Sequence, residues 1–550
     1  MNRLRAIALI PLAFLLIFFC YPLIQIARES FIVSDISQGR GLFAVFGDAS
    51  YLRIASFSLE QAALSTALTL ATGLPAAYLF ARFNFPLKPV WMAVATVPFV
   101  MPTIVVAAAF NSLLGPRGLV NLGLQQLGQT PIQFTGTLGI ILLAHVFFNF
   151  SVVVRIVGSF WAALDDRLAE MAASLGADRW QTFWRVTLPV AAPAIGAAAV
   201  LTFLFTFTSF GIILLLGGAR FNTLETEIYR QTSQSLRLDI AASLAFVQLL
   251  ITLVLGLISS HLQARASVSL DLQAQASTSR PINTPALRLG LLALLLFIIV
   301  VILAPLISLI SRSLNFDGAP LRFYAALSEN PRGSAFFVSP LIAIRNSLAF
   351  ASLTAIVALL MGVPLAYVLG QRPTRWTRLL DVLLLLPLGT SAVTLGLGMF
   401  ITFDTPIFGF DLRTSPVLLP LAHTLIALPF VVRTLLPSVR AISQTLREAA
   451  AQLGATPLQV LRWIDLPLMT GPLLAAAVFA FATSLGEFGA SLLISRPDFP
   501  TMPLVISDLL GRPGAANYGQ AMAMSTLLMA VTTLSVLLIE RVGGRRGAIL

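Results

Sequence analysis

Long apolar runs are the feature that most constrains this chain. A helix needs about 20 apolar residues to cross the roughly 30 Å hydrocarbon core of a bilayer, and this sequence supplies such runs repeatedly, with 57% hydrophobic and only 11% charged residues. Because lipid offers no hydrogen bonds to an open backbone, these runs must form helices. The sequence predicts an all-α, polytopic membrane protein with about 12 transmembrane helices. The predicted spans are 6–27, 56–81, 89–114, 136–158, 190–216, 240–262, 289–311, 346–370, 379–403, 414–436, 470–495 and 518–540.

Charge placement predicts how the chain is oriented. With the N-terminus in the cytoplasm, most of the 35 Lys and Arg residues fall on the cytoplasmic side, as the positive-inside rule requires. Both termini are then cytoplasmic, and the basic face suits anionic lipid headgroups. The basic residues do not cluster into a nucleic-acid footprint, so no nucleic-acid partner is expected. The span at 136–158 is the weakest, because His145, Asn149 and Arg155 interrupt it.

The chain contains an internal repeat at a long period. Gly-Leu-Pro-Ala-Ala-Tyr at 73–78 recurs as Gly-Val-Pro-Leu-Ala-Tyr at 362–367, and Leu-Ala-His at 143–145 recurs at 421–423. Extra residues in the first copy fit the loop around 115–118. Six crossings per copy make the repeat parallel. The predicted units are a first transmembrane repeat (1–263), a polar cytoplasmic linker (264–285) and a second transmembrane repeat (286–550).

A cytoplasmic segment of about thirty residues separates the fourth and fifth crossings of each copy. Residues 170–177 read Glu-Met-Ala-Ala-Ser-Leu-Gly-Ala and residues 448–455 read Glu-Ala-Ala-Ala-Gln-Leu-Gly-Ala, each followed by a proline at the same spacing. The alanines favour a helix, the glycine ends it in left-handed geometry, and the proline restarts the chain at the next crossing. We expect a short surface helix whose small side chains admit a partner's groove, while Leu175 and Leu453 anchor its opposite side.

This segment resembles the EAA motif of binding-protein-dependent ABC importer permeases: Glu-Ala-Ala, three residues, Gly, nine residues, Ile-x-Leu-Pro. The match is close in the second copy and looser in the first, where Met171 and Val186 depart from the pattern. In that family the helix sits in a cleft of the ATPase subunit and transmits its closure to the membrane. The coupling residues implied by the resemblance are Glu170, Ala172, Gly176, Pro189, Glu448, Ala449, Ala450, Gly454 and Pro467.

The energy source is expected to lie outside the chain. Lys88 is the only lysine and follows Leu87, so the chain has no Gly-Lys-Ser/Thr phosphate loop. We expect a transport subunit that is not an enzyme and holds no cofactor, with ATP and Mg bound by a partner. The resemblance implies two ABC ATPase subunits on the cytoplasmic side, an extracytoplasmic solute-binding protein and a prokaryotic inner-membrane location.

The solute is suggested only by finer resemblance. Residues 143–149 and 217–229 look like the fused permeases of thiamine importers and of ferric-iron importers, and we favour thiamine. Residues 486–490 are also similar to molybdate and sulfate permeases. The rival from another class is an ion-gradient-driven secondary transporter with 12 helices. Such a carrier is expected to show several intramembrane acids and no docking helix.

Polar residues inside the spans are the remaining candidates. His145 and His423 occupy equivalent positions, either as functional groups or as interhelical hydrogen-bond partners. One histidine per copy and one cysteine in the whole chain make a poor metal site, so none is expected. Glu487 is the most deeply placed acid and its counterpart is Ser209. Both are candidates for the translocation path, with helix–helix bonding as the alternative.

Two further features carry no site assignment. The stretches 98–102 and 387–389 contain prolines or glycine and indicate bent helices, either near the path or as packing devices. The loop that holds Glu225, Glu227 and Tyr229 is expected to be external and solvated, with a receptor contact as an alternative.

Overall fold

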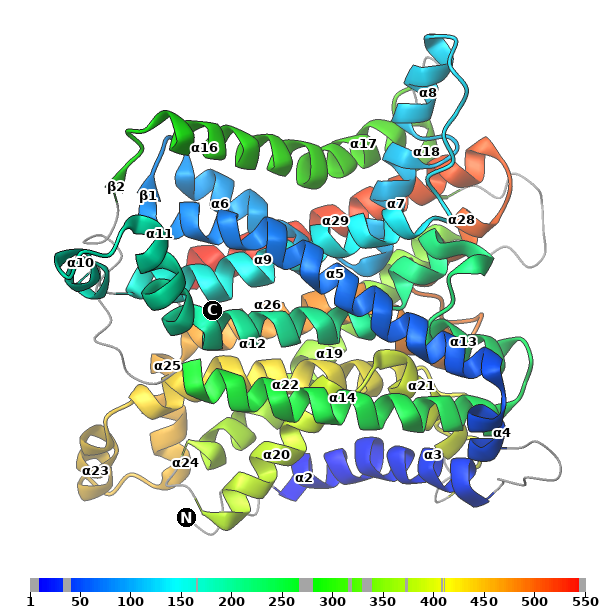
Figure 1. The fold of residues 1–550 in the computed structure, drawn as a ribbon. Helices are drawn as coiled ribbons and strands as arrows, with labels where there is room; N and C mark the ends of the chain where they lie inside the picture. The colour runs from blue at the N-terminus through cyan, green and yellow to red at the C-terminus, as the bar shows by residue number, and fades with distance from the viewer. Residues whose placement is uncertain are drawn as a thin grey trace.

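A computed structural model describes residues 9–32, 41–164, 167–266, 280–314, 319–328, 339–370, 374–406, 409 and 411–543. These residues form long helices that lie side by side, with short helices and loops gathered at the two ends of the bundle (Figure 1). The two-residue strands β1 (Phe83–Asn84) and β2 (Arg280–Pro281) form a small parallel pair. The part of the chain described here is therefore all-α apart from this pair.

The first sequence copy supplies the following elements in chain order: α2 (Leu9–Leu15), η1 (Leu16–Cys20), α3 (Tyr21–Ile32), α4 (Gly41–Gly47), α5 (Ala49–Arg82), α6 (Lys88–Thr96), η2 (Val97–Val100), α7 (Thr103–Leu114), α8 (Leu119–Gln126), α9 (Leu138–Ala163), α10 (Arg167–Ser174), α11 (Arg179–Thr182), η3 (Phe183–Thr187), α12 (Leu188–Phe207), η4 (Ile213–Gly217), η5 (Gly218–Arg220), α13 (Leu224–Ser233) and α14 (Leu238–Ala266).

The second copy repeats this order without a counterpart of α8: α16 (Pro285–Phe297), η6 (Ile298–Leu303), α17 (Ala304–Ser313), α18 (Arg322–Ala325), α19 (Pro340–Leu369), α20 (Arg375–Gly389), α21 (Ala392–Thr402), α22 (Leu418–Ala441), α23 (Gln444–Gln452), α24 (Pro457–Val460), η7 (Leu461–Asp465), α25 (Leu466–Leu468), α26 (Thr470–Gly486), α27 (Gly489–Ile494), α28 (Met502–Gly511) and α29 (Ala515–Gly543).

The polytopic architecture predicted from the sequence is confirmed. Within the described residues, 9 helices are long and apolar enough to cross a membrane, and a helix pair bent by 78° at Met469 raises the number to 10. Every predicted span falls on an apolar helix or on consecutive helices. The continuity of four spans is wrong, however: those at 89–114, 190–216, 379–403 and 470–495 are each interrupted midway.

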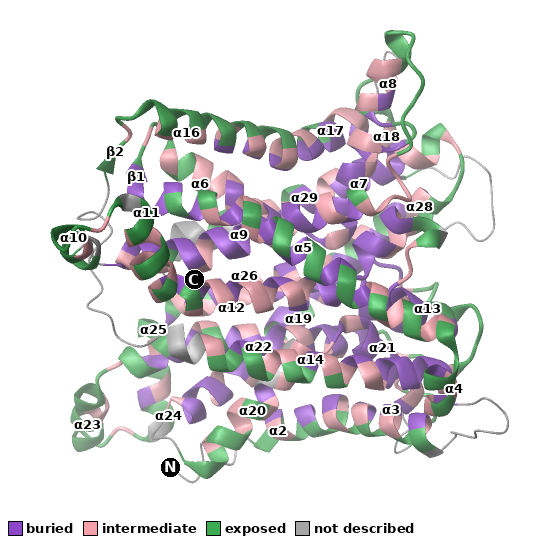
Figure 2. Ribbon diagram, viewed as in Figure 1, coloured by how far each residue is buried: buried purple, intermediate pink, exposed green. Residues whose placement is uncertain are grey.

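The span that looked weakest is among the most enclosed. In the most apolar window of α9, 72% of the residues are buried, and in its counterpart α22 the share is 78%. Figure 2 shows both helices as largely buried. Polar groups are tolerated there because neighbouring helices, rather than lipid, surround them. His145 and Asn149 lower the hydropathy of this span, and the structure explains them because α9 lies inside the bundle.

The first crossing of each copy packs against the other copy. Phe14, Leu15 and Phe19 belong to an apolar core built otherwise from second-copy residues. Conversely, Leu294 and Ile298 belong to the core that contains α7 and α9. The predicted boundary near residue 286 therefore marks the sequence repeat, whereas packing interlocks the two copies.

The repeated Gly-x-Pro motif has the same packing role in both copies. A Cβ placed on Gly73 would lie 2.8 Å from Cβ of Val153, and one placed on Gly362 would lie 2.5 Å from Cγ1 of Val431. Only glycine lets α5 approach α9, and α19 approach α22, this closely. The internal repeat is thus a repeat of helix contacts.

The end of the linker returns to the first copy. Most of the predicted linker, residues 267–279, lies outside the described residues, and α14 continues to Ala266. Arg280 and Pro281 then pair with Phe83 and Asn84. The start of the second copy is therefore tied to the end of α5.

The two ends of the bundle carry different elements (Figure 1). α10, α23 and the β pair lie at one end, where α2 begins. α8, α13 and α28 lie at the other. α8 projects from that end and belongs to the loop where the first copy has its extra residues.

Candidate coupling and translocation site

The two motif segments form the short helices predicted from the sequence. α10 and α23 end in the same hydrogen-bonded cap: Ala177 N–H donates to the Ala172 carbonyl at 3.0 Å, and Ala455 N–H donates to that of Ala450 at 3.0 Å. This six-residue bond requires left-handed backbone geometry at the intervening glycine. Gly176 has φ +87° and Gly454 has φ +83°.

The expected anchoring role of the two leucines is wrong. Leu175 is 89% exposed and Leu453 is 90% exposed, so neither packs against its own chain. The cap turns each leucine outward at the tip of the helix. Met171 and Trp180 beside the first tip, and Leu446 and Leu458 beside the second, are also exposed. Each segment thus presents an exposed apolar surface, the kind that marks a protein contact. We call these two surfaces the knobs: the first is α10 with the exposed side chains around Leu175, and the second is α23 with those around Leu453.

The prolines do not restart the helices as predicted. The helix after Gly176 begins at Arg179 and the one after Gly454 begins at Pro457. Each then passes through a π-helical turn, η3 or η7, before Pro189 or Pro467. The prolines therefore lie one π-turn inside the helix, where the altered hydrogen bonding accommodates a residue without N–H.

The remaining motif residues lie on the knobs. Glu170 and Glu448 are exposed on α10 and α23, and Ala449 is exposed as well. Ala172 and Ala450 are half-buried and accept the cap bonds. The structure thus groups the predicted residues at two equivalent surfaces at one end of the bundle.

The interrupted spans meet at a central junction, which we define as the breaks at 101–102, 208–210, 390–391 and 487–488. The equivalent residues Phe210 and Phe488 stack on each other, with ring centroids 5.5 Å apart and an interplanar angle of 28°. Gly486 lies against Pro102, across the boundary between the copies. Broken backbone at membrane depth is tolerated only where protein or water surrounds it.

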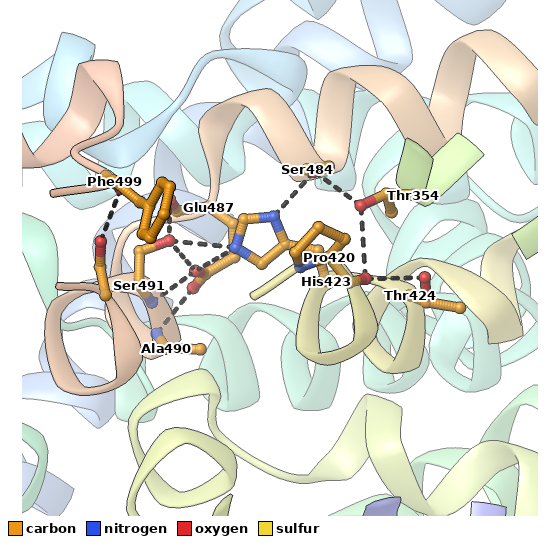
Figure 3. Close-up of polar contacts among 10 residues, drawn as sticks. Thr354, Pro420, His423, Thr424, Ser484, Glu487, Ala490, Ser491 and Phe499 are labelled. Carbon is orange, nitrogen blue, oxygen red and sulfur yellow. Dashed lines mark hydrogen bonds and ion pairs between the residues drawn. The ribbon is translucent and has the colours of Figure 1, made fainter. Parts of the chain in front are cut away.

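Glu487 and His423 form one buried polar cluster at this junction (Figure 3). The Glu487 carboxylate accepts hydrogen bonds from the backbone N–H groups of Ala490 and Ser491, both at 3.0 Å, and so caps α27. His423 Nε2 lies 3.3 Å from Glu487 Oε2 and 3.0 Å from Ser491 Oγ. His423 Nδ1 lies 2.7 Å from Ser484 Oγ. The cluster ties α22, α26 and α27 together.

The equivalent cluster of the first copy contains no carboxylate. His145 Nδ1 lies 3.0 Å from Ser65 Oγ, and its Nε2 lies 2.9 Å from Ser209 Oγ. All three residues are buried. Both histidines thus hold helices together through hydroxyl groups, which favours the structural alternative for them. Ser209 and Glu487 do lie at equivalent places of the junction.

The loop around Glu225 is not the solvated loop expected from its charges. Glu225 and Glu227 lie in the first turn of α13 and are buried. Gln248 Nε2 donates to Glu225 Oε1 at 2.5 Å, and Oε2 has no hydrogen-bond partner among the described residues. Burial raises the pKa of Glu225 to about 7, although Ser391 and Gln248 lower it in part. Tyr229, one turn on, packs on Phe210 at 5.7 Å.

Sequence reasoning missed Glu225, although two signals were present. Gln248 interrupts an apolar span, which calls for a polar partner. Thr223 and Thr501 recur at the same displacement as the histidines, and both begin a short helix after the fifth crossing of their copy. That recurrence marks a folded element rather than a loop.

Comparison with known proteins shows which permeases the chain resembles. Residues 73–268 match the family described as binding-protein-dependent transport system inner membrane component. The thiamine transport system permease protein ThiP of Brucella abortus is 28% identical over 92% of this chain and 91% of its own length. That of Escherichia coli is 25% identical over 91% of each chain. The chain is therefore similar to these inner-membrane permeases over nine-tenths of its length.

Solved structures of ABC transporters resemble part of this chain. The crystal structure of a bacterial ABC transporter involved in the import of the acidic polysaccharide alginate covers 48% of this permease and 96% of the matched chain, with 23% identity and a TM-score of 0.41. The relatives of full length, in contrast, span both copies. The match of these relatives over both copies confirms the fused tandem type predicted from the repeat.

The similarity to ABC importer permeases bears on the two classes of transporter that the sequence left open. The permease is a multi-pass transport component, and an ion-gradient-driven carrier is not favoured. The two apolar knobs agree with this choice, since a secondary transporter has no need of them.

Proposed function

We propose that this permease imports a thiamine-like solute, delivered by an extracytoplasmic binding protein and driven by two ABC ATPase subunits that dock on the two knobs. The main observation in support of this docking is a pair of identically capped helices. Their leucines, Leu175 and Leu453, point away from the chain. Each knob combines apolar area with an exposed glutamate, Glu170 or Glu448. A partner groove lined by apolar and basic groups would complement it.

The number of ATPase subunits follows from the number of knobs. Both knobs lie at the same end of the bundle (Figure 1). One chain then offers two docking places, so a pair of ATPase subunits meets a pseudo-symmetric surface. ATP and Mg would be bound by those subunits, in keeping with the absence of a phosphate loop from this sequence.

The thiamine assignment rests on the relatives. Permeases named for thiamine transport match more than nine-tenths of the chain in Brucella abortus and Escherichia coli. The structure of the alginate transporter was determined in one case with a periplasmic solute-bound protein. A receptor for this permease would meet the end that carries α8, α13 and α28. Ferric iron remains the second solute to test.

The translocation path is proposed to run through the central junction. Glu487 and Ser209 flank the Phe210–Phe488 stack, and Glu225 lies on the helix that contacts Phe210. Carboxylates held in an apolar setting would attract a cationic solute to this path. On this path the Phe210–Phe488 pair would be the barrier, and separation of the two copies would open it.

Sidedness is tested with the one native cysteine removed. In a Cys20→Ser background, Leu175→Cys and Leu453→Cys should react with a membrane-impermeant maleimide only in inverted inner-membrane vesicles. Leu127→Cys, next to α8 at the other end and 77% exposed, is the matched control and should react only from outside. The reverse labelling pattern would overturn the proposed orientation.

Docking and solute are tested together after reconstitution. The permease, a candidate ATPase and a binding protein are placed in liposomes with labelled thiamine or ferric iron. ATP should drive uptake, and the ATPase should protect the Leu175→Cys and Leu453→Cys variants, but not the Leu127→Cys variant, from the maleimide. Uptake driven by an ion gradient without an ATPase would contradict the proposal.

A further inference from the structure

The second copy holds its knob through a buried charged contact that the motif does not explain. Arg447 lies on α23, three residues from the start of that helix, and its Nε donates to Oδ1 of Asp465 at 3.0 Å. Asp465 ends η7 and its side chain is fully buried. A carboxylate in such a place is strongly destabilising without a partner.

Tyr367 completes the contact. Its hydroxyl donates to Oδ2 of Asp465, so both carboxylate oxygens are satisfied. The Arg447 guanidinium lies over the Tyr367 ring, with its carbon 5.1 Å from the centroid. A second nitrogen of Arg447 donates to the Val439 carbonyl at 3.3 Å. The three side chains Arg447, Asp465 and Tyr367 are called the triad below.

The triad joins the knob to three membrane helices. Tyr367 lies two residues before the end of α19, Val439 lies near the end of α22, and Asp465 stands at the point where the chain enters the span that continues as α26. A planar guanidinium with several donors can hold three elements at once, which a single hydrogen bond cannot. Motion of α23 relative to any of them would break a buried polar contact.

The sequence of the first copy does not repeat the Arg447–Asp465 pair. The residues equivalent to Arg447 and Asp465 are Ala169 and Thr187. The tyrosine is retained as Tyr78, but its ring packs edge-on against Trp161 and Phe83, with both centroid distances 5.7 Å. Arg82, at the end of α5, donates instead to the Leu164 carbonyl at 2.9 Å, which is a hydrogen bond to the backbone and not an ion pair with a carboxylate. Aromatic contacts restrict direction less strictly than the bonds of the triad.

We propose that the triad is a strut that transmits ATPase movement from α23 to α19, α22 and α26, so that the second copy is driven more rigidly than the first. This inference rests on the proposed docking of an ATPase at the knobs. Arg447, Asp465 and Tyr367 are positioning residues in this account, because none of them reaches the solute or the nucleotide.

Stiffness is measured first on the permease alone. Spin labels are placed by Gln452→Cys with Leu360→Cys, and at the equivalent first-copy positions by Ser174→Cys with Ala71→Cys, all in a Cys20→Ser background. The second-copy distance distribution should be the narrower one. Asp465→Asn keeps the side-chain volume but presents an amide donor to Arg447 or Tyr367, and it should widen that distribution at least to the first-copy width.

Coupling is measured next in the reconstituted transporter. Asp465→Asn should lower solute transported per ATP at least fivefold, whereas ATPase association and basal hydrolysis stay within twofold of wild type. Tyr367→Phe, which keeps the ion pair, should give an intermediate ratio. Thr187→Val and Tyr78→Phe are the matched first-copy controls and should leave the ratio within twofold.

The possible outcomes distinguish a failure of the strut proposal from a failure of the proposed ATPase docking. An unchanged distance width together with an unchanged transport-to-ATP ratio in Asp465→Asn would overturn the strut. If Asp465→Asn fails to assemble, the same two readouts in Tyr367→Phe decide, and wild-type values there overturn it. Failure of the wild-type permease to bind an ATPase would sink the proposed docking, while the distance measurement would still report on the triad.

Discussion

The two copies of the permease share a backbone plan but differ in where charge is buried. At the central junction His145 meets Ser65 and Ser209, whereas His423 meets Ser484, Ser491 and the Glu487 carboxylate. The helix breaks, the aromatic pair and the histidines all correspond between the copies. Geometry is thus held in common, while the carboxylate at the junction, Glu487, is present in the second copy only.

The same contrast holds elsewhere in the molecule. The knobs have the same cap, but Arg447 and Asp465 occur in the second copy only. In α13, the opposite holds: Glu225 belongs to the first copy and its counterpart in α28 is Pro503. A fused chain can accept such differences, since each copy mutates independently, whereas a homodimer cannot.

The largest effect is expected where the copies agree. Gly454→Pro and Gly176→Pro should each abolish ATP-driven transport, because proline cannot adopt φ near +85° and loses the N–H that donates to Ala451 or Ala173. Membrane insertion should be normal. Gly128→Pro, which breaks a left-handed glycine of φ +69° at the other end, is the control and should leave transport within about threefold.

Charge reversal tests the same surfaces without altering the backbone. Glu448→Lys and Glu170→Lys should each lower transport at least tenfold in vesicle uptake assays, by the proposed electrostatic match to the ATPase. Normal transport in one of the two would show that the copies dock differently. Normal transport in both would count against the coupling role.

The next prediction compares the stability lost when the His423 cluster and the His145 cluster at the junction are each disrupted. Glu487→Ala leaves the N–H groups of Ala490 and Ser491 without their acceptor and removes the partner of His423, so it should cost about 3 kcal/mol of stability. Ser209→Ala removes one hydroxyl contact and should cost about 1 kcal/mol. Thermal unfolding in detergent measures both. Equal losses of stability in the two variants would contradict the proposed difference between the two clusters.

A pH series tests the buried acid of the first copy. The pKa of Glu225 is raised from 4.5 to about 7 by burial, so the folded protein holds this proton more tightly than the unfolded chain. Its stabilising contribution is present at low pH and is lost as pH rises from about 4.5 past 7, by on the order of 3 kcal/mol.

Glu225→Gln should flatten that part of the profile of Tm against pH between 5 and 8. Glu227→Gln is the matched control on the same helix, where the carboxylate is paired with Arg230, and it should lower Tm because that ion pair is lost. A Glu225→Gln profile parallel to that of wild type would show that Glu225 does not titrate in this range.

The smallest effect is expected in α8, for which the described part of the second copy has no counterpart. Asn121 of α8 donates to the carbonyls of Gly115 and Ile132 and accepts from Ile132 N–H, so it closes the projecting loop on itself. Asn121→Ala should speed proteolysis of this loop several-fold and shift the global Tm by less than about 2 °C. A large shift in Tm would mean that α8 supports the bundle.

Much of the fold was predictable because its signals are local. Apolar runs of sufficient length marked the crossings, and the repeated Gly-x-Pro and Glu-to-Gly segments marked equivalent elements. The left-handed caps at Gly176 and Gly454 follow from bonds within five residues. The candidate knobs could therefore be found without any tertiary information.

The sequence by itself determined the membrane class, the parallel repeat and the two knobs, since hydropathy and helix capping depend on neighbouring residues. Only the tertiary structure decided which crossings break, that the first helix of each copy also packs against the other copy, that Leu175 and Leu453 face outward and that Glu225 is buried. Tyr367 and Asp465 meet across 98 residues. Such contacts depend on how helices pack, and no local pattern specifies them.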